Sequence, residues 1–218
     1  MTQIIKVNPK NPDQQLLRQA AELLRQGKVI GYPTETVYGL GVNAFEPEAV
    51  ERLYRLKERA ANKSVILLIE GEEMFRELVA DVPTPALRLL ESFWPGPLTI
   101  IFRANQCLPP HLQPTVALRV SSHPIASGLV RELKKPLVSS SANISGVPPA
   151  RSAQQVQKSF PQGLDLIIDG GLAGESAVST IVDVTTGKIT ILREGKIGLE
   201  ELQLAVGERI LQGASVYE

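Results

Sequence analysis

Apolar residues recur along the 218-residue chain with two different periods, one typical of helices and the other of strands. The helical spacing of leucines and alanines predicts a first helix. We expect Asn11 to cap it, Pro12 to take its first position and the helix to end before Gly27. Further helices are predicted at residues 46–59, 74–79, 85–93, 124–133, 153–159 and 199–211. Short apolar runs predict strands at residues 4–7, 65–69, 98–102, 116–120, 137–140, 164–168, 181–184 and 189–192.

Strands and helices alternate along most of the chain, and this order is typical of an α/β fold. Only residues 185–188 separate the last two predicted strands, so these two strands must pair as an antiparallel hairpin and the sheet has mixed strand directions. No repeat and no low-complexity stretch divides the sequence. We therefore expect a single globular domain over residues 1–211, followed by a short tail at residues 212–218.

The composition is that of a folded protein, with 43% hydrophobic and 21% charged residues. A formal net charge of zero argues against nucleic-acid binding through global charge, although it leaves room for a local basic patch. Cys107 has no second cysteine to pair with, and His111 and His123 do not share a metal-ligand spacing with it. No apolar run approaches the roughly 20 residues of a membrane helix, so we expect a cytoplasmic protein that makes no membrane contact.

Two polar segments follow apolar lead-ins. Residues 31–41 follow Val29 and Ile30, and they place Thr34 and a second threonine between a proline and two glycines. Residues 137–146 run from an apolar strand into serines, an asparagine and a glycine. Ligands collect beyond the carboxyl ends of strands in open α/β sheets, so two such loops could line one crevice. Taken alone, residues 31–41 are also compatible with an ordinary polar loop between a strand and a helix.

Candidate cationic residues occur at a helix end and within an apolar strand. Lys57, Arg59 and Lys63 lie at the end of a predicted helix, where they could hold a phosphate chain or a carboxylate, or could simply form a solvated surface run. Arg119 instead lies within an apolar strand, on the face that alternation gives to Thr115. A buried arginine needs an anion, and the sequence alone allows either a ligand carboxylate or a protein carboxylate.

Further polar residues stand at strand ends, namely Ser179 with Thr180 and Arg193 after residues 189–192. The glycine-rich residues 170–174 lack the ending of a Walker A loop, and the chain has no Gly-x-Ser-x-Gly elbow. The candidate groups supply hydrogen bonds and positive charge rather than a nucleophile. They favour an anionic substrate and phosphoryl or nucleotidyl transfer by electrostatic stabilisation.

Six motifs in order resemble those of the YrdC/Sua5 family, the L-threonylcarbamoyladenylate synthases. They are the Pro-Thr-Glu-Thr-Val-Tyr-Gly-Leu-Gly segment, Lys57-x-Arg59, residues 93–99, residues 116–120, Ser141-x-Asn143 and residues 179–183. The resemblance implies a single-domain, twisted, open mixed sheet with helices packed around it and a concave basic cavity. It also implies an enzyme that joins L-threonine, bicarbonate and ATP into threonylcarbamoyl-AMP with release of pyrophosphate, an early step toward N6-threonylcarbamoyladenosine in tRNA.

The same resemblance implies a role for each candidate residue. Thr34, Arg119 and Ser179 are similar to the threonine-binding residues, and Arg119 is expected to hold the threonine carboxylate. Lys57 and Arg59 are similar to the catalytic phosphate clamp. The expected ATP-binding residues are Arg59, Lys63, Thr115, Ser141, Asn143 and Arg193. Mg²⁺ would enter mainly on the nucleotide, and no protein metal site is expected.

The chain departs from the family pattern at Glu58, which lies between Lys57 and Arg59, and at Ser64, which follows Lys63. It resembles the short form of the family, which lacks the C-terminal domain and relies on separate proteins to transfer the threonylcarbamoyl group to tRNA. The alternative is a non-catalytic module that binds structured RNA in the same basic cavity, as in ribosome assembly. Such a module would bind RNA with a steep salt dependence and would not depend on threonine.

Overall fold

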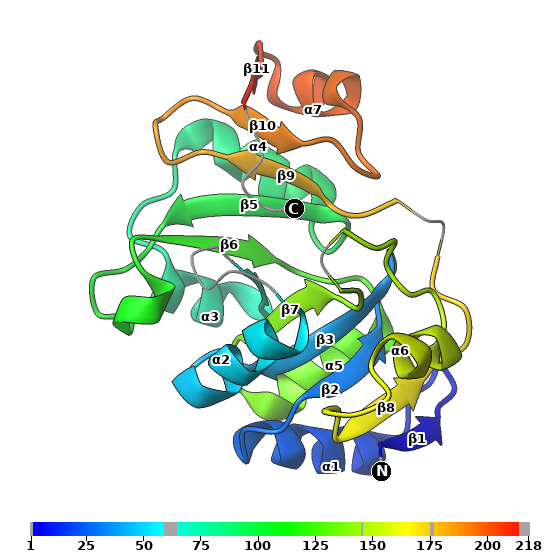
Figure 1. Ribbon diagram of the computed structural model, residues 1–218. Coiled ribbons are helices and arrows are strands. Elements are labelled where there is room, and N and C mark those ends of the chain that lie inside the picture. The colour runs from blue at the N-terminus through cyan, green and yellow to red at the C-terminus, as the bar shows by residue number, and fades with distance from the viewer. Residues whose placement is uncertain (1, 59–64, 145, 175–176, 214–218) are drawn as a thin grey trace.

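The computed structural model describes residues 2–58, 65–144, 146–174 and 177–213 (Figure 1). Within these residues, eleven strands form one mixed sheet in the order β1-β8-β2-β3-β7-β4-β6-β5-β9-β10-β11. The strands are β1 (Gln3–Lys6), β2 (Ile30–Pro33), β3 (Tyr38–Asn43), β4 (Ile66–Leu68), β5 (Leu98–Arg103), β6 (Thr115–Arg119), β7 (Leu137–Ser141), β8 (Leu166–Asp169), β9 (Thr180–Asp183), β10 (Thr190–Arg193) and β11 (Leu211–Gln212). The α-helices are α1 (Gln14–Arg25), α2 (Pro47–Leu56), α3 (Gly71–Leu78), α4 (Thr84–Phe93), α5 (Pro124–Leu133), α6 (Ala153–Ser159) and α7 (Leu199–Val206).

The predicted α/β class and mixed sheet are confirmed. Strands β9 and β10 form the expected antiparallel hairpin, whereas β4 and β6 pair in parallel. Helices α5 and α6 have the predicted bounds, and their starts have a clear cause. In α5, Pro124 occupies the first helical turn after His123, whose ring nitrogen caps the Ile125 N–H, and in α6 Ser152 caps the Gln155 N–H.

Strand β3 was not predicted, because residues 31–41 were expected to form a loop that follows a strand. The structure instead has an antiparallel β2–β3 hairpin with its turn at residues 34–37. Glycines in β3 hide the alternation typical of strands, since Gly39 and Gly41 lie on the face that packs against the Tyr32 ring. A Cβ atom on Gly41 would lie only 2.7 Å from that ring, so the hairpin needs glycine there.

Several other boundaries differ from the prediction, among them the start of α3 at Gly71, and the following three have a clear cause. Helix α1 is capped by Asp13, which accepts the Gln15 N–H at 2.8 Å, and not by Asn11. Helix α2 ends at Leu56, because Glu58 has a left-handed φ of 51°. Helix α7 ends at Val206, where Gly207 has a φ of 72°, and is followed by β11. Residue 212 therefore lies within the sheet, next to the expected boundary between domain and tail.

The core lies on both faces of the sheet. Helices α1 and α5 pack on each other and bury one cluster against β2, β7 and β8. Helices α2, α3, α4, α6 and α7 contribute to a larger cluster. In Figure 1, α2 and α6 lie in front of β2 and β3, and α5 lies behind them. In the described part of the chain, no helix has the length and apolar character needed to cross a membrane.

A smaller cluster identifies the part of the sheet that holds the candidate site. Ile101, Ala117 and Ile181 form this cluster, with Ile66 and Leu192 packed beside it. These residues come from neighbouring strands β4, β5, β6, β9 and β10. The ends of β4, β6, β9 and β10, together with β7 and the β2–β3 turn, line the cavity described next.

Candidate functional site

One cavity is lined by residues from the two polar segments and from the ends of four further strands, β4, β6, β9 and β10. Its lining residues are Thr34, Thr36, Val37, Tyr38, Gly39, Ile66, Arg119, Ser139, Ser140, Ser141, Val178, Ser179 and Arg193. Five of the residues predicted from the sequence therefore lie around one space, namely Thr34, Arg119, Ser141, Ser179 and Arg193. The expectation that two polar loops line one crevice is met, because β3 and β7 are adjacent strands.

The β2–β3 turn is closed by its own threonines. The Thr34 hydroxyl donates to the Val37 carbonyl at 2.6 Å and accepts the backbone N–H groups of residues 36 and 37. Its single proton is thereby used, so in the 2.9 Å contact between the two hydroxyls Thr36 must donate to Thr34. Thr34 lines the cavity as predicted, but here its hydroxyl proton shapes the turn. Its direct contact with a ligand stays a prediction.

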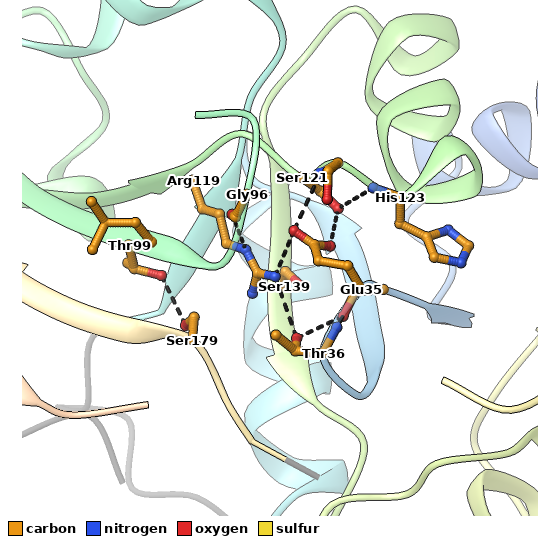
Figure 2. A network of polar contacts seen from close by, with 12 residues as sticks. Glu35, Thr36, Gly96, Thr99, Arg119, Ser121, His123, Ser139 and Ser179 are labelled. Carbon is orange, nitrogen blue, oxygen red and sulfur yellow. Dashed lines mark hydrogen bonds and ion pairs between the residues drawn. The ribbon is translucent and has the colours of Figure 1, made fainter. Parts of the chain in front are cut away.

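Arg119 is buried and finds a protein carboxylate as its anion. Its Nη2 lies 2.8 Å from Glu35 Oε1 and 3.3 Å from the Thr36 hydroxyl, and its Nε donates to the Gly96 carbonyl at 3.1 Å (Figure 2). The side chains of Arg119 and Glu35 are only 7% and 13% exposed. The sequence left open which anion would pair with Arg119, and in the structure the partner is Glu35.

Both oxygens of the Glu35 carboxylate accept hydrogen bonds from the protein. Oε2 accepts the Ser121 hydroxyl at 2.5 Å, and Oε1 also accepts the Ser122 N–H at 3.2 Å. Burial by itself raises the pKa of Glu35, but the positive charge of Arg119 and the hydrogen bonds from Ser121 and Arg119 outweigh it and lower the pKa below its usual value. Glu35 is therefore an anion at neutral pH.

His123 continues this network toward helix α5. Its backbone N–H donates to the Ser121 hydroxyl at 3.2 Å, and its ring Nδ1 accepts the Ile125 N–H. Burial lowers the pKa of His123, although the nearby Glu35 acts in the opposite direction. The ring is thus neutral at neutral pH, as its acceptor role at Nδ1 requires.

Two serines offer hydroxyls to the cavity. Burial raises the pKa of Tyr32, so its hydroxyl stays protonated and donates to Ser139 at 2.8 Å. Ser179 accepts from Arg193 Nη2 at 3.1 Å and lies 3.0 Å from the buried Thr99 hydroxyl. Each serine oxygen is fixed by a donor from the protein. The Ser139 proton is then available to a ligand, and so is that of Ser179 when Thr99 is the donor.

Lys57 lies beside the second polar segment rather than on the cavity wall. It is buried, and its ammonium group donates to the backbone carbonyls of Ser141 and of Asn143, the latter at 2.9 Å. The structure therefore brings together three of the residues predicted for catalysis and ATP binding. Within the described residues, Asn143 Oδ1 is buried without a hydrogen-bond partner, which leaves an acceptor there.

Among the described residues, Thr115 is also absent from the cavity lining. Thr115 lies at the start of β6, on the same strand face as Arg119 but four residues away. Arg59 and Lys63 lie outside the described residues. Among the residues that are described, no cluster of three or more His, Cys, Asp or Glu side chains could hold a metal ion.

Sequence reasoning missed several residues of the site. Glu35, Thr36 and Ser139 belong to the two polar segments, but none was given a role. Thr99 and Ser121 also received none, although Thr99 lies within the motif at residues 93–99 and Ser121 directly follows the motif at residues 116–120. The one available signal was the need of Arg119 for an anion, which a search of nearby motifs for a carboxylate could have matched to Glu35.

A mixed α/β fold with a cavity lined by serine and threonine hydroxyls and two arginines has the features of a small-molecule binding site. Comparison with known proteins identifies the family of this chain. The family profile of Sua5, YciO and YrdC, which carries the description "Telomere recombination", matches residues 22–195. The chain belongs to this family.

Its relatives include proteins that carry the name threonylcarbamoyl-AMP synthase. The one from Pyrococcus abyssi is 38% identical over 211 residues, which is 95% of this chain and 62% of that protein. The one from Pseudomonas fluorescens Pf-5 is 41% identical over 179 residues, or 79% of this chain and 95% of that protein. This chain thus spans about three fifths of the first relative and nearly all of the second.

Solved structures agree with this assignment. The structure of P. abyssi Sua5 complexed with L-threonine superposes with a TM-score of 0.90 at 38% identity, covering 96% of this chain and 62% of that chain. E. coli YciO superposes with a TM-score of 0.82 at 31% identity, covering 90% of this chain and 97% of that chain. Both the twisted mixed sheet and the family expected from the sequence are confirmed.

Proposed function

We propose that this protein is a threonylcarbamoyl-AMP synthase, which joins L-threonine, bicarbonate and ATP and releases pyrophosphate. The observation that carries the proposal is the buried Arg119 at the wall of a hydroxyl-lined cavity, which suits an amino acid with a carboxylate and a hydroxyl. The relatives that carry the name of this enzyme support it. The solved complex of P. abyssi Sua5 with L-threonine supports the choice of amino acid.

At the amino-acid end of the cavity, Arg119 Nη1 receives the threonine carboxylate. Ser179 and Ser139 supply hydroxyls whose oxygens are already held by protein donors, so each can donate to an acceptor of the substrate. Thr34 contributes mainly by fixing the turn that carries Thr36 and Glu35. The charged contact with Arg119 is the strongest of these, because hydrogen bonds to ionised groups contribute roughly 1.5–3 kcal/mol.

At the nucleotide end, Ser141, Asn143 and Arg193 contact ATP, and Thr115, Arg59 and Lys63 complete this set. Lys57 and Arg59 act on the phosphates. Threonine and bicarbonate first give a carbamate with loss of water. A carbamate oxygen then forms a bond to the α-phosphorus of ATP, and the bond from that phosphorus to the pyrophosphate oxygen breaks. Cations near the leaving group stabilise the charge that it gains.

The proposal extends to cofactors and partners. Mg²⁺ enters with the nucleotide phosphates, since this ion keeps most of its ligands from water and phosphate. The product is a reactive mixed anhydride, which separate transfer proteins pass to tRNA. Such a reaction belongs in the cytoplasm, where ATP and tRNA are present.

The test is a pyrophosphate-release assay with ATP, Mg²⁺ and bicarbonate, with and without L-threonine. We expect pyrophosphate release to require L-threonine. D-threonine should not replace it, because the contacts to the carboxylate and the hydroxyl fit only one enantiomer. Arg119→Met provides the matched variant, which removes the guanidinium and keeps an apolar chain of similar length. Release that is independent of threonine, or unchanged in Arg119→Met, would contradict the proposal.

The alternative function is a non-catalytic module for structured RNA. The neutral net charge of the chain argues against it, and so does the pairing of Arg119 with Glu35, which neutralises one of the two arginines that line the cavity. RNA binding that weakens steeply with salt, in a protein that releases no pyrophosphate, would favour this alternative.

A further inference from the structure

The guanidinium group of Arg119 has five N–H groups, and the protein uses three of them. Nε donates to the Gly96 carbonyl, and the two N–H groups of Nη2 face Glu35 and Thr36. In the described part of the chain Nη1 makes no hydrogen bond, and in Figure 2 it points away from Glu35. The edge formed by Nε and Nη2, which could hold an oxyanion with two parallel bonds, is thus occupied.

The Glu35 carboxylate, which pairs with Nη2 at this edge, is fixed in place. Glu35 accepts hydrogen bonds from Arg119, from the Ser121 hydroxyl and from the Ser122 N–H, and these come from the end of β6 and the residues that follow it. Its lowered pKa keeps it ionised at neutral pH. Arg119 and Glu35 together therefore carry no net charge at the cavity wall.

We propose that Glu35 restricts the Arg119 position to a singly charged carboxylate and keeps phosphate groups out of it. The inference rests on the proposed function, since it assigns a selectivity to the amino-acid end of the same cavity. Glu35 acts as a positioning and specificity-determining residue, because it holds Nη2 while the Gly96 carbonyl holds Nε, so that only Nη1 is left for the ligand.

The selectivity follows from charge and from donor number. The cost of removing an ion from water rises with the square of its charge, so a phosphate dianion loses more hydration than a carboxylate, and a neutral pair of side chains gives it no net attraction in return. Nη1 alone also cannot offer the two-nitrogen fork that arginine uses for phosphate. A singly charged carboxylate loses less hydration, and its oxygens can accept hydrogen bonds from both N–H groups of Nη1. A site that must hold an amino acid beside ATP would otherwise attract the nucleotide phosphates or the released pyrophosphate.

The experiment is isothermal titration calorimetry at about pH 8, without ATP, using L-threonine and inorganic phosphate as separate titrants. In the wild-type protein we expect phosphate to bind at least ~100-fold more weakly than L-threonine, because desolvation of an ion costs several kcal/mol and the neutral pair does not compensate the dianion for it. In Glu35→Gln, Arg119 keeps its charge without an anion, and we expect the ratio of phosphate to L-threonine affinity to rise at least ~10-fold.

Glu70→Gln is the matched control, because Glu70 pairs with Arg131 in an exposed ion pair away from the cavity. We expect it to bind both titrants like the wild type. An unchanged ratio in Glu35→Gln would overturn the proposal, as would a wild-type protein that binds phosphate as well as L-threonine. A wild-type protein that is folded but binds no L-threonine would instead overturn the proposed function on which this inference rests.

Glu35→Gln leaves a buried arginine without its anion and could fail to fold. Glu35→Asp is therefore titrated as well, since it keeps the negative charge beside Arg119 on a shorter side chain. We expect weaker L-threonine binding from the poorer positioning, while the exclusion of phosphate persists. An Asp variant that binds phosphate as tightly as L-threonine would overturn the proposal even if the Gln variant does not fold.

Discussion

Substitution of Ser121 by alanine tests the network that holds Arg119, and its size can be worked out from the structure. The Ser121 hydroxyl is buried and donates to Glu35 Oε2 at 2.5 Å, a short charge-assisted hydrogen bond. Its removal leaves a carboxylate oxygen without this donor in a side chain that is 13% exposed. We expect Ser121→Ala to lower the free energy of unfolding by roughly 1.5–3 kcal/mol.

Thermal unfolding followed by circular dichroism measures this loss. For a chain of this size, 1 kcal/mol corresponds to about 2–4 °C, so we expect the midpoint temperature to fall by roughly 3–12 °C at neutral pH. Ser122→Ala is the control, since Ser122 is exposed and contributes only its backbone N–H to Glu35. We expect the control to change stability by no more than about 0.5 kcal/mol.

The same experiment has a pH dependence with a defined sign. The pKa of Glu35 in the folded protein lies below its usual value near 4.5, so the folded protein binds this proton less readily than the unfolded chain. The stability that Glu35 contributes is therefore fully present above about pH 4.5 and is lost as the pH falls through the folded pKa. The difference between Ser121→Ala and wild type should shrink over that range. Equal midpoint temperatures of Ser121→Ala and the Ser122→Ala control at neutral pH would refute this reasoning.

Three further substitutions test other parts of the site. In Lys57→Met, loss of the ammonium that holds the Ser141 and Asn143 carbonyls should lower the rate of threonine-dependent pyrophosphate release at least ~10-fold, and a folded variant of wild-type rate would remove Lys57 from the catalytic set. In Thr99→Val, Ser179 loses one hydroxyl partner, so the Kd for L-threonine should rise about 5-fold while that for ATP stays unchanged; equal changes for both ligands would contradict this. In Gly195→Ala, the new Cβ would lie 2.3 Å from the Val178 carbonyl oxygen, so we expect a loss of about 1–3 kcal/mol in chemical denaturation, and no loss would mean that the loop before Ser179 adapts freely.

The sequence allowed the fold class and most elements to be predicted, because local signals determine them. Helix α5 is an example, since Pro124 and a regular apolar face set its bounds. Strand β3 was not predicted because glycines occupy alternate positions in it. Their role becomes clear only in the structure, where Tyr32 from β2 packs over them. The cap of α1 was assigned to Asn11 instead of Asp13, since both residues are good N-caps and the choice depends on where the chain turns.

The candidate site was predictable only in part, because residue types are visible in the sequence but contacts between distant segments are not. Residue type alone indicated that Arg119 needs an anion, but Glu35 lies 84 positions earlier, and only the approach of the β2–β3 turn to the end of β6 makes it the partner. Likewise, Ser139 gains its significance from the donation by Tyr32, which depends on the packing of the hairpin. Contacts between distant segments carry no local sequence signal.

The most direct test of the central claim is product formation with labelled bicarbonate. The purified protein is incubated with ATP, Mg²⁺, ¹⁴C-bicarbonate and L-threonine, and the mixture is separated rapidly by chromatography. The proposed function predicts a labelled adduct that contains AMP, requires L-threonine and appears together with pyrophosphate. A folded protein that binds ATP and L-threonine but forms neither adduct nor pyrophosphate would contradict it.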